Sequence, residues 1–357
     1  MYWDYLVKST GPYPYRKRSV AWDHIHNTHV VEKENLTIVE KPLSVSPLVP
    51  TIFHEPWWLN AATGNCYEQI EVSDGHHTVG RFPYIVHAKH GMKISMLPTL
   101  THLLGPAVDE GSGNANTRFL QRYTVTRELI AKLPPVHRFR QKIHRGYPEV
   151  LSFQAEGFRT GVQFTFEIEP LPEADAWNQM RNKTRNVIRR AEEELQVFEM
   201  NDVAEFIGFY ETNLAARGRK MYSPPEINAA VCTAALEKSA GKIFAAKDPK
   251  TSSLVAAIFV AFDSKTTYYL MSTRTAGSGN GAIPLLIWSA IRFSLKRNLA
   301  FDFDGVANQG AVLLYIGFGG KPKPTYIVAK DSKRIKFLNS SRGVLGLEAE
   351  ENFFDYF

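Results

Sequence analysis

The chain has 357 residues, of which 44% are hydrophobic and 22% charged, and its net charge is +6. This composition is typical of a globular protein of about two domains, and it excludes a disordered, collagenous or coiled-coil chain. Two cysteines exclude a disulfide framework and a four-cysteine zinc site. The longest apolar run, 254–262, is too short to span a membrane, and the N-terminus lacks the apolar stretch of a signal peptide. We therefore expect a cytoplasmic protein without a transmembrane segment that binds anionic partners.

The first half of the chain predicts an irregular arm followed by strands and helices. The segment 1–50 contains five prolines and little periodicity. Its histidines, His24, His26 and His29, have a spacing that matches no standard metal site, so we expect no metal. The patterns that follow predict strands over 66–72, 78–87 and 92–96, a helix over 116–132, a strand over 136–143, a helix over 148–156 and a strand over 161–169.

The second half repeats this order of elements after three added helices. A helix over 173–195 has the strongest apolar period in the chain, and Trp288 lies in another apolar helix as a core residue. The patterns predict helices over 173–195, over 203–214 and from 223 onward, strands over 242–247, 254–262 and 266–273, a helix over 282–297, a strand over 299–303, a helix over 310–316 and a strand over 325–329.

Both halves thus contain three consecutive strands, a helix, a strand, a short helix and a last strand. This order predicts an α/β (α+β) fold of two similar tandem domains, each a mixed, mostly antiparallel sheet flanked by helices. We place the N-terminal domain at 51–160 and the C-terminal domain at 161–340, between the arm at 1–50 and an acidic and aromatic tail at 341–357.

A glycine-rich segment lies between the strand 266–273 and the helix 282–297. Such a turn presents free backbone N–H groups at a helix N-terminus, a geometry that binds phosphate. The alternative is a flexible turn whose glycines supply positive φ angles. The candidate donor-binding residues are Arg274, Gly277, Ser278, Gly279, Asn280 and Gly281.

The R-x-x-G-x-G pattern after a strand meander resembles the pyrophosphate loop with which the Gcn5-related N-acetyltransferase (GNAT) superfamily holds coenzyme A. A wider resemblance, over about 51–330, is to FemAB-like proteins, a two-domain branch of that superfamily. The stretches that carry it are FHEPWWLNAA, VGRFPY, FQAEGF, TRNVIRRAEEELQV, FDFDGV and IGFGGKPKPTYIV.

This resemblance implies two tandem GNAT-like domains and the transfer of an acyl or aminoacyl group onto an amine. Known members use aminoacyl-tRNA and act on peptidoglycan precursors, and other relatives are acyl-CoA-dependent transferases of envelope or polysaccharide metabolism. The clear R-x-x-G-x-G loop favours acyl-CoA, for example acetyl-CoA, as the donor. Members commonly carry a lysine before the Gly-Phe-Gly element, where this chain has Tyr315 and Ile316; the nearest lysine is Lys321.

The candidate acceptor-binding residues are cationic. Arg181, Arg185 and Arg189 are spaced by four and would form one stripe of the helix 173–195. With Lys321, such a stripe could hold the phosphates of an anionic small-molecule or of a lipid- or nucleotide-linked acceptor. The alternative is a solvated face that pairs with the glutamates over 192–194.

The catalytic candidates are carboxylates and tyrosines, because all eleven histidines lie between His24 and His144. Asp302 and Asp304 flank Phe303 on a predicted strand, so they share a face, and each would raise the pKa of the other, which suits a general base. Their alternative role is to cap the turn before Gly305. Of Tyr268 and Tyr269, which point to opposite faces, Tyr269 is our candidate.

The resemblance adds Tyr315 as the group that protonates a departing thiolate. Two other functions remain open: an aminoacyl-tRNA-dependent transferase acting on a peptidoglycan precursor, and a non-catalytic module that binds an anionic ligand through the basic stripe. Charged tRNA would support turnover in the first case, and the second would show steep salt dependence without competition from coenzyme A.

Overall fold

The computed structural model describes residues 46–335, apart from 90, 145–149, 278, 280 and 307. Every described residue belongs to one compact unit, the one that begins at Pro42. The three histidines of the arm and the tail at 341–357 lie outside the described residues.

The N-terminal half follows the predicted order with three additions and one division. The short helices η1 and α1 and the short strand β5 were not predicted, and the expected strand over 78–87 is divided between β2 and β3, which pair in different sheets. The elements are η1 (Ile52–His54), α1 (Pro56–Thr63), β1 (Glu68–Asp74), β2 (His77–Tyr84), β3 (His87–Lys89), β4 (Met92–Ser95), β5 (Ala107–Val108), α2 (Ala115–Ala131), β6 (Arg138–Lys142), α3 (Leu151–Ala155) and β7 (Arg159–Ile168).

The C-terminal half contains the predicted three-stranded meander and the helices around it. The elements are α4 (Glu173–Gln179), α5 (Asn182–Glu194), β8 (Gln196–Met200), α6 (Val203–Ala215), α7 (Pro225–Glu237), β9 (Gly241–Lys247), β10 (Leu254–Phe262), β11 (Thr266–Arg274), α8 (Ala282–Lys296), β12 (Ala300–Asp302), α9 (Gln309–Gly317) and β13 (Lys321–Asp331).

The predicted single helix over 173–195 is wrong, because the chain breaks between α4 and α5. Met180 has an extended backbone and is buried, and the N–H group of Arg181 donates to the carbonyl oxygen of Gly317 at 3.0 Å. A long-range hydrogen bond thus replaces one that would continue the helix. The strand β8, which follows α5 directly, was not predicted.

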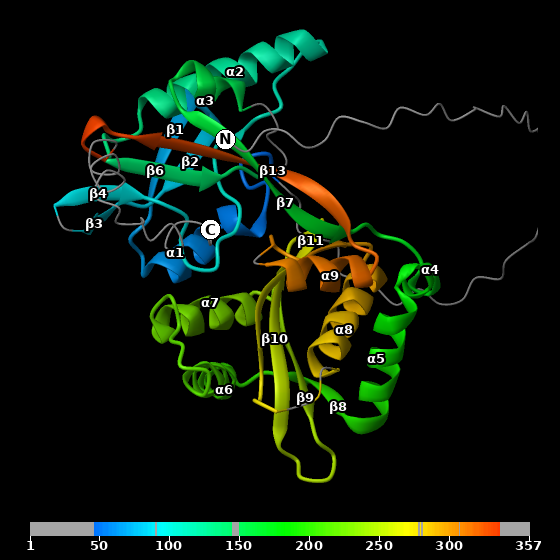
Figure 1. The fold of residues 1–357 in the computed structure, drawn as a ribbon. Coiled ribbons are helices and arrows are strands. Elements are labelled where there is room, and N and C mark those ends of the chain that lie inside the picture. Colours follow the sequence, from blue (N-terminus) through cyan, green and yellow to red (C-terminus); the bar gives the residue numbers. More distant parts are fainter. Residues whose placement is uncertain are drawn as a thin grey trace, which may run out of the picture. The chain divides into compact units, whose positions relative to one another are not determined.

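The strands form a three-stranded sheet, β1-β2-β5, and a ten-stranded sheet in the order β3-β4-β6-β13-β7-β12-β11-β10-β9-β8. Neighbours in the large sheet are antiparallel except for β4 with β6 and β11 with β12. The expected α/β class, with a mixed and mostly antiparallel sheet flanked by helices, is confirmed. The large sheet joins the halves, because β13 pairs with β6 on one side and with β7 on the other (Figure 1).

Helices cover both faces of the C-terminal strands, with α6 and α7 on one face and α5 and α8 on the other (Figure 1). The strand β10 explains this arrangement, because its apolar run is buried on both sides: Ile258 packs in the α8 core and Phe259 in the core of α1, α6 and α7. Trp288 packs against Trp177 with ring centroids 5.2 Å apart, which confirms it as a core residue.

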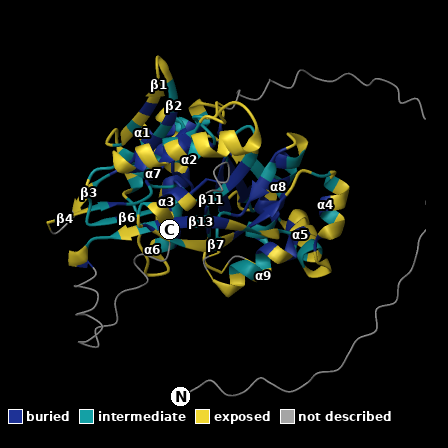
Figure 2. Cartoon of the chain, turned by 90° about the horizontal axis from the view of Figure 1, so that it is seen from above, coloured by how far each residue is buried: buried dark blue, intermediate teal, exposed yellow. Residues whose placement is uncertain are grey.

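Exposed residues lie along the outer sides of α2 and α5, while buried residues gather around α8 (Figure 2). Among the described residues, none of the helices combines the length and apolar character needed to cross a membrane.

Candidate functional site

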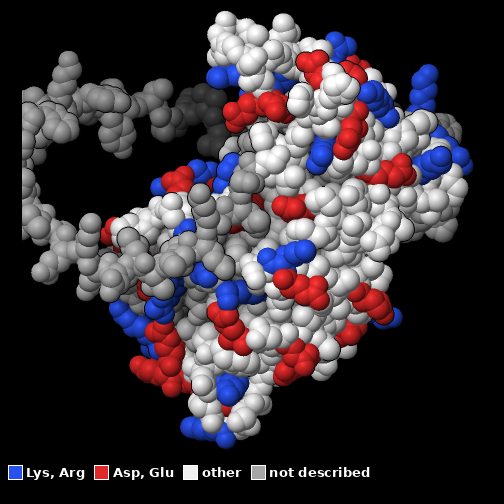
Figure 3. Space-filling model, turned by 180° about the vertical axis from the view of Figure 1, so that it is seen from behind, with Lys and Arg blue, Asp and Glu red and all other residues white. Residues whose placement is uncertain are grey.

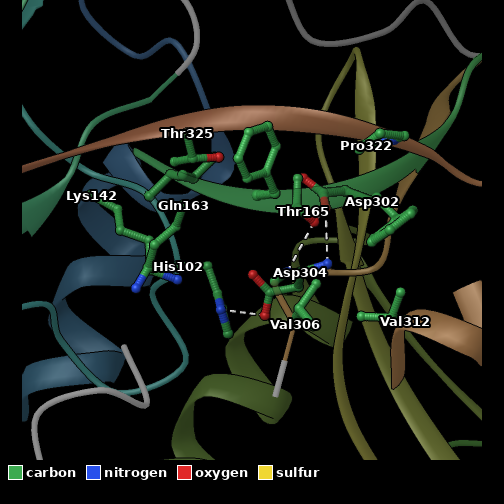
Figure 4. Close-up of a pocket in the computed structure, with 14 residues that line it drawn as sticks. His102, Lys142, Gln163, Thr165, Asp302, Asp304, Val306, Val312, Pro322 and Thr325 are labelled. Atoms are coloured by element: carbon green, nitrogen blue, oxygen red, sulfur yellow. Dashed lines mark hydrogen bonds and ion pairs between the residues drawn. The ribbon is translucent and has the colours of Figure 1, made fainter. Parts of the chain in front are cut away.

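A cavity of about 620 Å³ lies beyond the C-terminal end of β12 (Figure 4). It forms because β12 ends early. The strands β11 and β12 pair only from Thr266↔Ala300 to Tyr268↔Asp302, whereas β11 continues to Arg274. The cavity therefore lies beside the open edge of β7, and its lining comes from both halves of the chain.

Asp302 and Asp304 both line this cavity, but not in the way that strand alternation implies. The strand ends at Asp302, and Asp304 has a left-handed backbone with φ of 62°. Oδ1 of Asp302 accepts hydrogen bonds from the Thr165 hydroxyl at 2.5 Å and from the Asp304 N–H at 2.8 Å. Asp302 therefore caps the turn, which is the alternative role expected for the two aspartates. The turn presents the Asp304 carboxylate to the cavity.

The Asp304 carboxylate contacts Nδ1 of His102, which lines the same cavity from the N-terminal half (Figure 4). The expected set of carboxylates and tyrosines did not include this histidine, which lines the same cavity as both aspartates. Histidine is absent from the sequence beyond His144, but the fold brings one in from the other half. The signal that could have indicated it is the concentration of histidine in one half of the chain, because the cavity takes its lining from both halves.

The tyrosine candidates lie behind the cavity rather than in its lining. Tyr315 is buried and stacks on Phe303, with ring centroids 4.4 Å apart. Burial, together with the nearby carboxylates of Asp304 and Asp302, raises the pKa of Tyr315 to about 12. Burial also raises the pKa of Tyr269, and the Tyr315 hydroxyl adds to this shift. The two tyrosines are thus close to each other, and both keep their protons at neutral pH.

The glycine-rich segment joins β11 to α8 as expected. Gly277 has a positive φ of 80°, which favours glycine, and a Cβ atom at Gly277 or Gly279 would meet nothing within 4 Å. A guanidinium nitrogen of Arg274 donates to the carbonyl oxygen of Gly279 at 3.3 Å. The other two candidates, Ser278 and Asn280, lie outside the described residues.

Gly281 differs from the other two glycines because it is closely packed. A Cβ atom at this position would lie 2.8 Å from the Cβ of Ala191 and 3.2 Å from the carbonyl oxygen of Val187, both on α5. The close approach of α8 to α5 therefore requires glycine here, which is a structural reason for one of the predicted donor-binding residues.

We expect Gly281→Ala to lower the free energy of unfolding by about 1–3 kcal/mol, because the added methyl overpacks the contact between α5 and α8. Gly279→Ala, in open space, should change it by less than about 0.5 kcal/mol. Urea denaturation followed by circular dichroism measures both. Equal stabilities of the two variants would contradict the packing role of Gly281.

The three arginines of the predicted stripe lie along α5 and not along one helix over 173–195. Arg181 is the N-cap residue of α5, and Arg185 and Arg189 are within the helix. The guanidinium group of Arg189 lies 5.4 Å from the centre of the Trp177 ring, and Arg185 contacts the side chain of Asn182. Lys321 is exposed at the start of β13. None of these four cations lines the cavity, whereas Lys142 does.

Comparison with known proteins identifies the class of this fold. Residues 178–310 match the family described as acetyltransferase (GNAT) domain. The crystal structure of FemX is similar with a TM-score of 0.57 at 11% identity, covering 76% of this chain and 90% of that chain. The C-terminal domain of a putative lysylphosphatidylglycerol synthetase from Agrobacterium fabrum has a TM-score of 0.52 at 9% identity, covering 83% of this chain and 95% of that chain. No curated protein matches the sequence.

The chain therefore has the fold of GNAT-type acyltransferases. Its resemblance to the FemAB-like branch is confirmed by the GNAT family match, which contains the glycine-rich loop and both aspartates, and by the similarity to FemX over most of both chains.

Proposed function

We propose that the chain is an N-acyltransferase that moves an acyl group from acyl-CoA onto an amine of an anionic envelope or polysaccharide precursor. The observation that carries the proposal is the course of β11. This strand leaves β12 beside the cavity at Tyr268 and reaches the glycine-rich loop after Arg274. Six residues of strand span about 20 Å, which is the order of length of an extended pantetheine arm. A donor held at the loop could therefore present its thioester at the cavity.

The loop end of β11 fits a diphosphate. Gly277 and Gly279 leave open space beside the backbone, and α8 begins at Ala282 without a side chain that caps its first N–H groups. Free N–H groups and the helix dipole at such a terminus favour an anion.

The cavity end fits an acceptor that is both anionic and apolar. The Lys142 ammonium supplies a positive charge, and Phe164 and Val306 supply exposed apolar surface. One of the similar structures is named as a putative lysylphosphatidylglycerol synthetase, and a lipid-linked acceptor has both properties. A lipid- or nucleotide-linked amine is therefore our proposed acceptor class.

The chemistry at this site is the attack of a neutral amine on the thioester carbonyl. The C–N bond forms, the C–S bond breaks, and the departing thiolate takes a proton. Tyr269 and Tyr315, both protonated at neutral pH, are the proposed acids. Asp302 shapes the turn, and Asp304 acts on the amine side of the reaction through its contact with His102.

The test is calorimetric titration of the protein with acetyl-CoA. We expect micromolar binding that Gly279→Trp abolishes, because the indole would fill the space for the diphosphate. Gly208→Trp is the matched control, since a side chain there also enters open space but on the exposed face of α6. Unchanged binding in Gly279→Trp would remove the loop from the proposal.

A second candidate donor is aminoacyl-tRNA. The observation that favours it is an exposed basic segment, Arg217, Arg219 and Lys220, next to the loop: Arg217 donates to the carbonyl oxygen of Arg274 at 2.7 Å. A long polyanion could contact such a segment. Absence of acetyl-CoA binding together with turnover of charged tRNA would select this candidate.

A non-catalytic module for anionic ligands has less support. On the face shown in Figure 3, basic and acidic side chains are interspersed and neither sign covers a continuous area. Binding of an anionic polymer that falls steeply with salt and is not displaced by coenzyme A would favour such a module.

A further inference from the structure

We propose that His102, held by Asp304, is the general base that removes a proton from the acceptor amine; this inference rests on the proposed acyl transfer. The two side chains come from opposite halves of the chain and meet at the cavity wall (Figure 4). A base and the group that orients it, in contact at a cavity, form the arrangement that activates nucleophiles in many enzymes.

The contact defines which imidazole nitrogen faces the substrate. Nδ1 of His102 contacts Oδ2 of Asp304, and a carboxylate accepts a proton donor, so Nδ1 carries the hydrogen. Nε2 then has a lone pair that can accept a proton. The His102 side chain is 23% exposed and that of Asp304 is 9% exposed. The histidine is thus open to a substrate, while its carboxylate partner is shielded.

Buried hydrogen bonds hold the segment that carries His102. On one side, the Trp58 indole donates to the Thr101 hydroxyl at 3.0 Å. On the other side, the N–H group of Leu104 donates to the carbonyl oxygen of Lys142 at 2.8 Å. The ring of Phe53 lies beside the imidazole, with centroids 6.1 Å apart. His102 therefore has a fixed backbone on either side and an aromatic wall behind it.

The turn that carries Asp304 is fixed as firmly. Asp302 accepts its N–H group, and the next N–H group, that of Gly305, donates to the Thr165 hydroxyl at 2.9 Å. Asp302 of β12 and Thr165 of β7 therefore hold two consecutive N–H groups of the turn. Both members of the pair are positioned before any substrate binds, as an efficient proton acceptor requires.

The proton transfer balances with acyl transfer. An acceptor ammonium gives one proton to Nε2 of His102 and becomes a neutral amine, which attacks the thioester carbon. The C–N bond forms and the C–S bond breaks, and the departing thiolate takes a proton from a neighbouring acid and leaves as a thiol. The nitrogen loses its second proton as the amide forms, which restores that acid, and solvent removes the first proton from the imidazolium. The charged groups that line the cavity with His102 are Asp302, Asp304 and Lys142.

The experiment compares two small acceptors with acetyl-CoA as donor: methylamine, which is protonated at neutral pH, and methoxyamine, which is not. We expect His102→Gln to lower kcat for methylamine by about 10²–10⁴-fold. The loss for methoxyamine should be less than a tenth of that factor, because a neutral amine does not have to lose a proton before it attacks. The acidic limb of the pH–rate profile with methylamine should also disappear. Asp304→Asn should shift the same quantities in the same direction by a smaller factor, because it leaves the imidazole in place.

His77→Gln is the matched control, since His77 is exposed at the start of β2; its kinetics should equal those of the unchanged protein. Calorimetry with coenzyme A should give the same affinity in all variants. Equal losses for both amines in His102→Gln, with coenzyme A binding intact, would overturn the base assignment and leave the acyl transfer standing. If the unchanged protein acetylates neither amine, the proposed transfer and the inference are both overturned.

Discussion

Alanine in place of Phe303 is expected to lower the free energy of unfolding by about 3–5 kcal/mol. The Phe303 side chain is 1% exposed. Its ring stacks on Tyr315 at 4.4 Å and meets the edge of Phe301 at 5.0 Å, so its removal costs both the transfer energy of the ring and a cavity among aromatic side chains. Because the free energy of unfolding of a whole domain is about 5–15 kcal/mol, this single change should remove a large share of the protein's stability. Urea denaturation monitored by tryptophan fluorescence would measure it.

Phe164→Ala is the matched control, because Phe164 is 54% exposed on β7 of the same sheet. We expect its free energy of unfolding to change by no more than about 0.5 kcal/mol. Similar losses in the two variants would show that the aromatic stack behind the cavity is not tightly packed. Since Phe303 lies between Asp302 and Asp304, its loss should also loosen the turn that presents the Asp304 carboxylate.

Acid is expected to destabilise the fold through a pair of buried histidines, His54 and His144. Both are buried and their rings contact edge to face at 4.9 Å. Burial lowers the pKa of His144 to about 4, and burial together with His144 lowers that of His54 well below its ordinary value. Nδ1 of His54 is paired with the Thr51 hydroxyl at 2.8 Å. The pair is therefore neutral in the folded state.

The direction of the pH effect follows from these lowered pKa values. Between the unfolded pKa of about 6.5 and the folded values, the unfolded chain binds more protons, so stability is complete above about pH 6.5 and falls as the pH drops toward 4. At pH 5, protonation of each histidine in the unfolded chain should lower the free energy of unfolding by about 2 kcal/mol. Urea denaturation at pH 7.5 and pH 5 should give this loss in the unchanged protein.

The variant His144→Gln should lose about half of this pH dependence, because one of the two buried histidines is gone while an amide can still donate to the carbonyl oxygen of Pro106. His77→Gln, which changes an exposed histidine, should keep all of it. A pH dependence that is identical in all three proteins would contradict the assignment of the acid sensitivity to this pair.

Most of the C-terminal half could be predicted from sequence because its signals are local. The strands β9 to β11 alternate with short polar turns, and α8 has a continuous apolar face, so their observed bounds lie within one residue of the prediction. The helix over 173–195 failed because the break at Arg181 depends on a hydrogen bond to Gly317, which is distant in sequence. Periodicity carries no information on such a partner.

The site residues, like the elements of the fold, divide into those indicated by local sequence signals and those that depend on distant contacts. Asp302 and Asp304, which line the cavity, could be proposed from sequence because they belong to a short motif, and so could the loop glycines. His102 could not, because its contact with Asp304 joins residues about two hundred positions apart. The arginine stripe stays a prediction, because its regular spacing begins at the N-cap of α5 and not within the single helix that periodicity indicated.

The central position of β13 has a consequence for how the protein is made. Nine strands of the large sheet precede β13 in the chain, yet β13 lies between β6 and β7. During synthesis these two strands must wait for residues 321–331 to leave the ribosome, and until then each has an unpaired edge that invites aggregation. A nascent chain stopped before residue 321 should therefore depend on a chaperone, and the cavity should be completed only when this segment is inserted.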